Sequence, residues 1–281
     1  MPVTTTDDIA IHFEVTGEAG APLVLIGGGA THLIDWREEF VAMLVAEGFQ
    51  VIRYDHRDIG LSPRFGGPDD VDGGYDLDDL ADDVLRILDT LGIASAHLAG
   101  HSMGGIIAQY LALDRPDRVR SMVLMSTIPG LDRDAYLTGP QVSHADLVPF
   151  TALPPELSLD QFVATQRGMH AEAFVFDEED ERAHAARQIA RGYDPNGFQR
   201  HMSALLRATD RLPRLRTLTL PTAVIHGSDD PGLKPRAAEL IAEAIPGATL
   251  HIHEGMGHRI ERALWPDHVA VIAATARRAD G

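Results

Sequence analysis

The chain has 281 residues, enough for one large domain or for a core that carries an insertion. Its apolar fraction of 44% supports a substantial core, while no apolar run reaches the ~18 to 20 residues that span a bilayer, so no membrane partner is expected. The formal net charge of −18 repels phosphate backbones and disfavours nucleic acid as a partner, and the lack of cysteine excludes disulfides, thiolate metal sites and a cysteine nucleophile.

The N-terminal residues 1–8 contain neither a basic region nor an apolar run, so they lack the features of a secretory signal. We therefore expect a soluble protein of the cytoplasm.

Short apolar runs alternate with helical patterns along the first half of the chain. The runs are typical of buried strands, and we expect strands at residues 23–26, 49–54, 96–99 and 122–125. A helix is expected at 78–91, where apolar side chains share one face until Gly92, and another at 106–113, which ends before Pro116.

The same alternation returns near the C-terminus. Strands are expected at 222–225 and 248–253, with a helix at 234–245 between them and a closing helix at 266–277. Continuous apolar strands that alternate with helices favour a parallel sheet. The predicted fold class is therefore α/β, with a mostly parallel central sheet covered by helices on both faces.

The middle of the chain differs from both ends. Residues 130–215 contain several prolines among helix-like pieces and no convincing strand, and the strand pattern resumes at Thr222. We predict a core formed by residues 1–129 and 216–281, with residues 130–215 as a helical cap insertion. The acidic run 177–181 within it is typical of a solvated helix face, with a cation site as the alternative.

The predicted insertion holds more apolar side chains than an exposed loop needs. We expect them to be divided between the insertion's own small core and the lining of a pocket over the sheet. They include Leu131, Tyr136, Leu137, Phe150, Phe162, Met169, Phe174 and Phe176.

The sharpest motif is Gly100-His101-Ser102-Met103-Gly104, a G-x-S-x-G pattern between a predicted strand and a predicted helix. A strand that turns directly into a helix strains the residue at the turn, and only small neighbours tolerate the close approach of the backbone. The turn holds the Ser102 hydroxyl above the carboxyl edge of the sheet, at a helix N-terminus. This context favours a nucleophile over a tight turn without chemistry, and Ser102 is the predicted nucleophile.

A serine nucleophile needs a general base, because its hydroxyl is protonated at neutral pH. The chain contains 14 His, and His258 is singled out by its position between the last predicted strand and the last helix. His251 and His253 alternate onto one strand face; we favour two partly exposed strand residues over a metal pair, because no third ligand is near in the sequence. No metal and no organic cofactor is expected.

The base needs an orienting carboxylate, and Asp229 and Asp230 both follow the predicted strand 222–225. Either one keeps the chain order serine, acid, histidine. Asp230 is the predicted acid, because in sequences of this kind the acid stands three residues after a glycine, here Gly227. Asp229 is then expected to cap the turn.

The oxyanion of an acyl-transfer reaction needs hydrogen-bond donors. One predicted donor is the Met103 backbone N–H, and the second comes from Gly27-Gly28-Gly29 after the first strand, where glycines permit close approach to a substrate oxygen. Gly29 is the predicted donor, to within one residue. A dinucleotide-binding loop fits less well, because the run is not G-x-G-x-x-G.

Together these motifs resemble those of the α/β-hydrolase superfamily. The resemblance covers nearly the whole chain apart from residues 130–215, and it implies a serine hydrolase with the triad Ser102, Asp230 and His258. Four motifs agree in order: Gly27-Gly28-Gly29, Asp55-His56-Arg57-Asp58-Ile59-Gly60-Leu61-Ser62, Gly100-x-Ser102-x-Gly104, and Gly227-x-x-Asp230 with Gly257-His258.

The second of these motifs departs from the superfamily pattern at Asp58, where glycine is usual. This version, together with Gly27-Gly28-Gly29 and Trp36, is similar to the actinomycete methylesterases that act on anthracyclines such as aclacinomycin. It also fits a wider subgroup of small-molecule hydrolases.

The expected function is a carboxylesterase, with a methylesterase as one form, that cleaves a small or medium organic ester through an acyl-enzyme. Serine at position 102 argues against epoxide hydrolases and haloalkane dehalogenases, which attack with a carboxylate. Three alternatives stay open: a C–C bond hydrolase, a cofactor-free perhydrolase and, from another class, a non-catalytic ligand-binding protein on the same fold.

Overall fold

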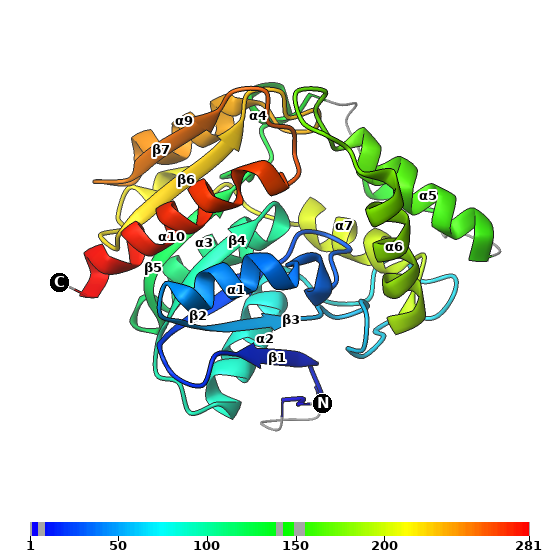
Figure 1. Ribbon diagram of the computed structural model, residues 1–281, viewed down its shortest axis with the longest axis horizontal. Coiled ribbons are helices and arrows are strands. Elements are labelled where there is room, and N and C mark those ends of the chain that lie inside the picture. The colour runs from blue at the N-terminus through cyan, green and yellow to red at the C-terminus, as the bar shows by residue number, and fades with distance from the viewer. Residues whose placement is uncertain (1, 5–8, 139–142, 149–154, 281) are drawn as a thin grey trace.

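The strands form one sheet in the order β1-β3-β2-β4-β5-β6-β7 (Figure 1). The computed structural model describes residues 2–4, 9–138, 143–148 and 155–280. β1 is antiparallel to β3, and all other neighbouring strands are parallel, which confirms the predicted fold class. The strands are β1 (Phe13–Thr16), β2 (Ala21–Ile26), β3 (Phe49–Tyr54), β4 (Ala96–His101), β5 (Val119–Met125), β6 (Thr222–Gly227) and β7 (Thr249–His253).

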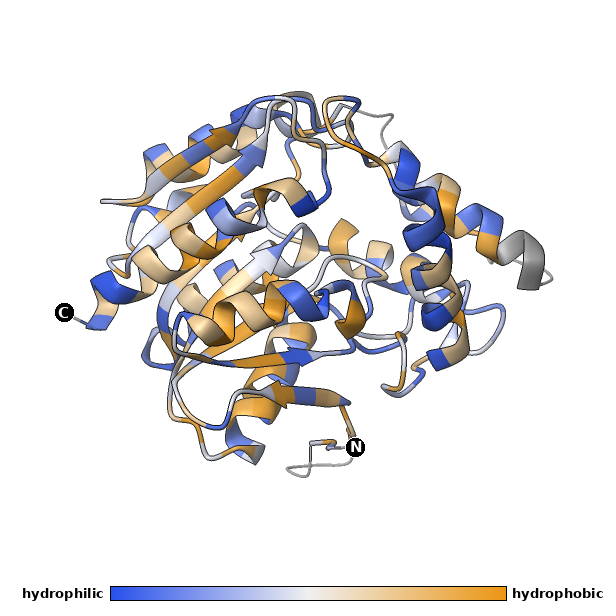
Figure 2. Cartoon of the chain, viewed as in Figure 1, coloured by the Kyte–Doolittle hydropathy of each residue, from blue (hydrophilic) through white to orange (hydrophobic). Residues whose placement is uncertain are grey.

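Helices cover both faces of this sheet because both faces are apolar. Successive strand residues point to opposite sides, so Val24 and Ile26 pack with one buried cluster while Leu23 and Leu25 pack with the other. The first cluster includes residues of α2 (Leu77–Thr90), α3 (Met103–Asp114) and α9 (Pro235–Ala244). The second includes residues of α1 (Glu38–Ala46) and α10 (Trp265–Asp280). Figure 2 shows the apolar strands between these helices.

Residues 130–215, which we call the β5–β6 segment, contain no strand in their described part, as predicted. They carry the helices α4 (Arg133–Tyr136), α5 (Pro155–Gly168), α6 (Glu178–Gly192), α7 (Gly197–Leu206) and α8 (Leu212–Leu215). Figure 1 shows α5 and α6 side by side at one end of the molecule, with α7 between them and the sheet.

The acidic run at the start of α6 is only partly solvated, so this prediction was wrong for Glu181. Glu178 and Glu179 are exposed, but the Glu181 side chain is only 11% exposed and pairs with Arg37, at 3.3 Å, and with Arg259. These two cations compensate the largely covered carboxylate and connect α6 to the loops after β2 and β7.

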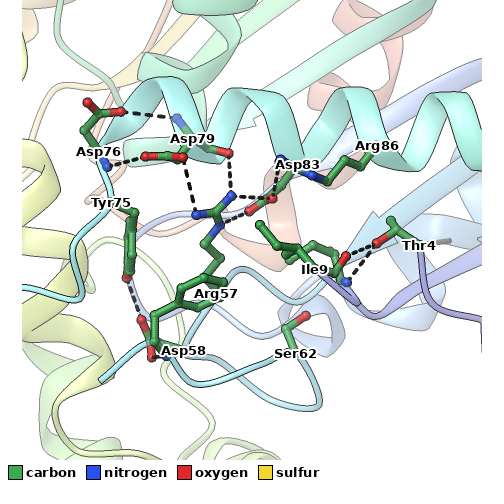
Figure 3. Close-up of polar contacts among 12 residues, drawn as sticks. Thr4, Ile9, Arg57, Asp58, Ser62, Tyr75, Asp76, Asp79, Asp83 and Arg86 are labelled. Atoms are coloured by element: carbon green, nitrogen blue, oxygen red, sulfur yellow. Dashed lines mark hydrogen bonds and ion pairs between the residues drawn. The ribbon is translucent and has the colours of Figure 1, made fainter. Parts of the chain in front are cut away.

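Asp58 lies in the loop after β3, and its side-chain contacts account for an aspartate at this position. The backbone φ of Asp58 is +66°, in the left-handed region that favours glycine. The Asp58 carboxylate accepts hydrogen bonds from Tyr75 Oη at 2.8 Å and from Phe65 N at 2.8 Å, and it pairs with Arg200 of α7 at 2.9 Å (Figure 3 draws the Tyr75 contact). These contacts offset the unfavourable backbone conformation.

The neighbouring Arg57 holds the same loop against α2. Its guanidinium forms a two-point contact with the buried Asp83, Nε to Oδ2 at 2.6 Å and Nη2 to Oδ1 at 2.9 Å, and also reaches Asp79 (Figure 3). Because Asp83 is fully buried, this pairing is needed to compensate its charge.

The carboxyl ends of the parallel strands meet at one edge of the sheet, which is where ligands bind in open α/β sheets. The loops after β2, β4, β6 and β7 carry Gly29, Ser102, Asp230 and His258 respectively. The fold therefore brings together all the predicted site loops. Among the described residues, no helix combines the length and the apolar character that a membrane crossing requires.

A buried histidine on α10 makes folding stability depend on pH. Neither ring nitrogen of His268 has a hydrogen-bond partner among the described residues, and burial, with a smaller effect of His253, lowers its pKa from 6.5 to about 3. Between these values the unfolded chain binds a proton that the folded chain does not. The stability associated with neutral His268 is therefore complete above pH 6.5 and is lost as the pH falls toward 3.

We expect His268→Leu to weaken this acid sensitivity. Removing the titrating group should raise the free energy of unfolding relative to the parent by roughly 2 kcal/mol at pH 5, since one pH unit is worth about 1.4 kcal/mol. Denaturant unfolding at pH 5, 6 and 8 measures the effect, with pH 8 as the control because His268 is neutral there in both states. An unchanged difference between variant and parent at all three values would contradict this assignment.

Candidate active site

Ser102 occupies a strained turn between β4 and α3. Its φ of +53° lies in the left-handed region although it is not a glycine. A Cβ on Gly100 would collide with the Gly104 backbone, and a Cβ on Gly104 would collide with the Ile26 carbonyl. The two glycines of the motif are therefore required by the packing of β4, α3 and β2.

Hydrogen bonds with the end of β5 and with the loop that follows it hold this turn in place. Ser102 N donates to Met125 O at 2.9 Å, and the Thr127 hydroxyl donates to Ser102 O at 2.7 Å. Because α3 begins at Met103, the amide groups at its N-terminus lie next to Ser102 and favour negative charge there.

The predicted base and acid are hydrogen-bonded to each other. His258 Nδ1 donates to Asp230 Oδ2 at 2.8 Å, which leaves Nε2 free to accept a proton. Burial alone would raise the pKa of Asp230, but the hydrogen bond and charge of His258 and the amides of Leu233 and Gly232 together hold it below its usual value. Asp230 is therefore a carboxylate at neutral pH.

The expectation that Asp229 caps the turn after β6 was wrong. Asp230 Oδ1 accepts the Gly232 and Leu233 amides, both at 2.9 Å, so Asp230 itself caps this turn. The exposed Asp229 instead accepts a hydrogen bond from the Ser228 hydroxyl at 2.7 Å. One oxygen of Asp230 thus fixes the carboxylate and the other orients the imidazole.

The backbone of His258 is held from two sides. His101 Nε2–H donates to the His258 carbonyl at 2.8 Å, and His258 N–H donates to Met169 O in the β5–β6 segment at 3.0 Å. Gly257 has no room for a Cβ, which would lie 2.7 Å from Met169 O. The loop that carries the base therefore packs directly on the β5–β6 segment.

Two further imidazoles, those of His226 and His101, lie near the Asp230–His258 pair. His226 Nε2 is 3.5 Å from Asp230 Oδ2, and the His101 ring lies 5.0 Å from the His258 ring, centre to centre. Burial lowers the pKa of His226, and burial followed by the charge of His258 lowers that of His101 to about 4. Both act as neutral hydrogen-bonding groups at neutral pH.

The glycine loop after β2 lies against the turn at Ser102. A Cβ on Gly28 would be 3.2 Å from Ser102 Cβ. Ala30 N–H donates to His201 Nδ1 and Thr31 N–H to Gly28 O, whereas the amides of Gly28 and Gly29 have no acceptor among the described residues. Both amides lie in the region predicted to supply the second oxyanion donor.

One cavity of about 890 Å³ is lined by Gly29, Ser102, Met103 and His258. Asp230 is not among the lining residues; it is buried and hydrogen-bonded to His258. The walls also include residues of α5, α6 and α7, so the β5–β6 segment forms part of the cavity wall.

The apolar residues predicted in this segment are divided between several places. Leu131, Leu137, Phe162 and Met169 line the cavity with Ser102. Phe174 and Phe176 line a second cavity of about 450 Å³. Tyr136 is buried in the main core, and Phe150 lies outside the described residues.

No metal centre is formed within the described part of the chain, where no three His, Asp or Glu residues are grouped for a metal ion. His251 and His253 are half-exposed on β7, which agrees with the favoured interpretation of these two residues. His251 Nε2 contacts Thr249 Oγ1 at 3.1 Å, and the His253 ring packs on that of His268.

Several residues that hold the site together were not predicted. His101, Thr127 and His201 make their contacts between segments that are distant in the sequence, whereas His226 lies four residues before Asp230. His101 stands inside the recognised motif, so its position was a usable signal. The other three have no local pattern that separates them from ordinary buried polar residues.

Comparisons with known proteins agree with the observed fold. A family model described as alpha/beta hydrolase fold matches residues 21–260. A curated relative, the rhodomycin D methylesterase of Streptomyces peucetius, is 33% identical over 98% of this chain and 97% of its own length.

Two solved structures share the fold. The enol-lactonase from Burkholderia xenovorans LB400 has a TM-score of 0.78 at 24% identity and covers 98% of this chain and 100% of its own. The meta-cleavage product hydrolase from Pseudomonas fluorescens IP01 has a TM-score of 0.74 at 21% identity, with 96% of this chain and 95% of its own covered. Identities this low support likeness of fold alone.

The two adjacent aspartates give a test of the site. We expect Asp230→Asn to lower ester turnover by up to ~10⁴-fold, because an amide cannot hold the imidazole in the required tautomer. Asp229→Asn is the matched control, since its exposed side chain bonds only to the adjacent Ser228 among the described residues and its backbone is unchanged, and it should retain turnover within about twofold of the parent. A greater loss in Asp229→Asn than in Asp230→Asn would reverse the assignment.

Proposed function

The chain belongs to the α/β-hydrolase family, and on this premise we propose that it is a serine carboxylesterase acting on the ester of a small or medium organic molecule. Ser102, His258 and Asp230 form its catalytic triad, and the Met103 and Gly29 amides bind the oxyanion. The observation that carries the proposal is the strained Ser102, which lines one cavity with His258 while His258 is hydrogen-bonded to a buried carboxylate.

The proposed mechanism follows from the roles of these groups. His258 Nε2 accepts the Ser102 proton as the hydroxyl oxygen attacks the ester carbonyl, and the tetrahedral oxyanion is stabilised by the two amides. The imidazolium then protonates the leaving alcohol. Water activated by His258 cleaves the acyl-enzyme and releases the acid. Asp230 stays ionised throughout and stabilises the imidazolium.

We further propose that the bond cleaved is a methyl ester. The rhodomycin D methylesterase is similar to this chain over nearly its full length, and the cavity is far larger than a methanol leaving group needs. A volume of about 890 Å³ is in the range of pockets that enclose whole drug-sized molecules. The acid portion of the ester would therefore fill most of the cavity.

Residues 1–129 and 216–281 are proposed to form the catalytic core, with residues 130–215 as a cap over the site. The support is the position of α5, α6 and α7 in the cavity wall, opposite the sheet edge. In this arrangement the core loops provide the acyl-transfer groups and the cap provides much of the surface that selects the substrate.

The direct test is Ser102→Ala. The variant should fold normally and lose at least ~10³-fold in turnover, because covalent catalysis is removed. A panel of methyl, acyl and lactone esters measures turnover, and a fluorophosphonate probe measures the reactivity of Ser102. Parent protein that is labelled but cleaves no ester would contradict esterase chemistry. Parent protein with neither reactivity would indicate a non-catalytic binding protein.

Selection by the cap is tested with two matched aromatic replacements. Phe162→Leu alters the cavity that contains Ser102 and should change the ratio of kcat/KM between bulky and small esters by roughly 10- to 200-fold. Phe176→Leu makes the same change in the second cavity and should leave this ratio nearly unaltered. Equal effects of the two replacements would count against a selective role for the cavity wall.

A further inference from the structure

His201 contacts the loop that carries the predicted oxyanion donor. It lies on α7 and is fully buried, with Nδ1 3.1 Å from Ala30 N and Nε2 2.8 Å from Arg57 O. An amide can only donate, so Nδ1 must be the unprotonated nitrogen, and Nε2–H then donates to the Arg57 carbonyl. One neutral tautomer satisfies both hydrogen bonds.

His56 holds the other end of the same loop. Its Nε2–H donates to Gly27 O at 2.9 Å, and its ring packs edge-on against that of His201 with 5.6 Å between ring centres. One imidazole therefore holds the carbonyl at the start of the segment Gly27–Ala30, and the other holds the amide at its end.

The loop needs such support, because its own sequence does not determine its conformation. Three consecutive glycines leave the backbone free to adopt many conformations. Ala30 has a φ of +60°, which is unfavourable for a residue with a Cβ. The Gly28 and Gly29 amides, which have no acceptor among the described residues, lie between the two points that the imidazoles hold.

Both imidazoles remain in the required form at neutral pH. Burial lowers the pKa of His201 to about 4, and burial followed by the charge of His201 lowers that of His56 to about 3. Protonation of His201 would place an N–H against the Ala30 N–H and remove its hydrogen bond.

We propose that His201, together with His56, is a positioning residue that holds the glycine loop so that the Gly29 amide points at the developing oxyanion. The inference rests on the proposed esterase function. It also gives the β5–β6 segment a second role, because α7 supplies a group that orders the catalytic loop in addition to covering the substrate.

Two isosteric replacements separate the two hydrogen bonds of His201. His201→Asn places an acceptor near the Nδ1 position and retains the bond to Ala30 N–H, whereas His201→Gln places a donor near the Nε2 position and retains only the bond to Arg57 O. We expect the Gln variant to lose between ~10-fold and ~10³-fold in kcat, because complete loss of one oxyanion donor costs ~10² to 10³-fold. Its KM should be nearly unchanged. The Asn variant should retain most of kcat.

A second readout reports the oxyanion site itself. A trifluoromethyl ketone forms a tetrahedral adduct with a serine nucleophile, so its affinity should fall in the Gln variant in parallel with kcat/KM and be retained in the Asn variant. His97→Gln is the matched control: His97 is a buried histidine on β4, hydrogen-bonded to Ser121 at 2.8 Å and outside the cavity lining. It should lower thermal stability without changing kcat.

Turnover is expressed per folded molecule, from thermal unfolding and near-UV circular dichroism of each variant. Suppose that the parent protein is active and that the Asn and Gln variants have equal kcat or differ from the parent only in KM. This result would overturn the positioning role and leave the esterase proposal intact. Parent protein that cleaves no ester and is not labelled would overturn both.

Discussion

The direct passage of β4 into α3 is the constraint on which the rest of the site depends. It places Ser102 in a left-handed conformation that costs on the order of 1–3 kcal/mol, and the surrounding packing must compensate that cost. The structure contains three other described non-glycine residues with positive φ, Ala30, Asp58 and Ser126, and each lies in a loop that follows β2, β3 or β5. Backbone strain is thus concentrated along the carboxyl edge of the sheet, where four neighbouring loops meet.

Buried neutral histidines stabilise much of this edge. An imidazole can accept a hydrogen bond on one nitrogen and donate on the other, so a single side chain can connect two backbone segments. His201 does this between the loops after β2 and β3, and His101 connects the turn at Ser102 to the backbone of His258. Burial lowers the pKa of both, which keeps them uncharged where a charge would be unfavourable.

The β5–β6 segment is connected to the core by more than apolar packing. Met169 O accepts the His258 amide, and on α6 both His184 and Gln188 donate to the Asp35 carboxylate, at 2.7 Å and 2.9 Å. Arg191 at the end of the same helix pairs with the buried Asp55 at 2.8 Å. Charged and polar contacts of this kind fix a precise arrangement only while each partner is present, so the segment and the loops after β2, β3 and β7 hold one another in place.

The sequence by itself was sufficient for the fold class, and it singled out Ser102, Asp230 and His258, whose loops lie at one edge of the sheet. Hydrophobic periodicity and chain order are local properties, and they identified the parallel strands, the turn at Ser102 and the two loops that carry Asp230 and His258. β1 and α1 were not predicted, because each is short and β1 is ordered by pairing with β3. The pairing of Glu181 with Arg37 and Arg259, and the hydrogen bonds of His56 and His201 to the glycine loop, were decided only by the tertiary structure. Each depends on a contact between segments far apart in the chain, and such contacts leave no periodic signal in either segment alone.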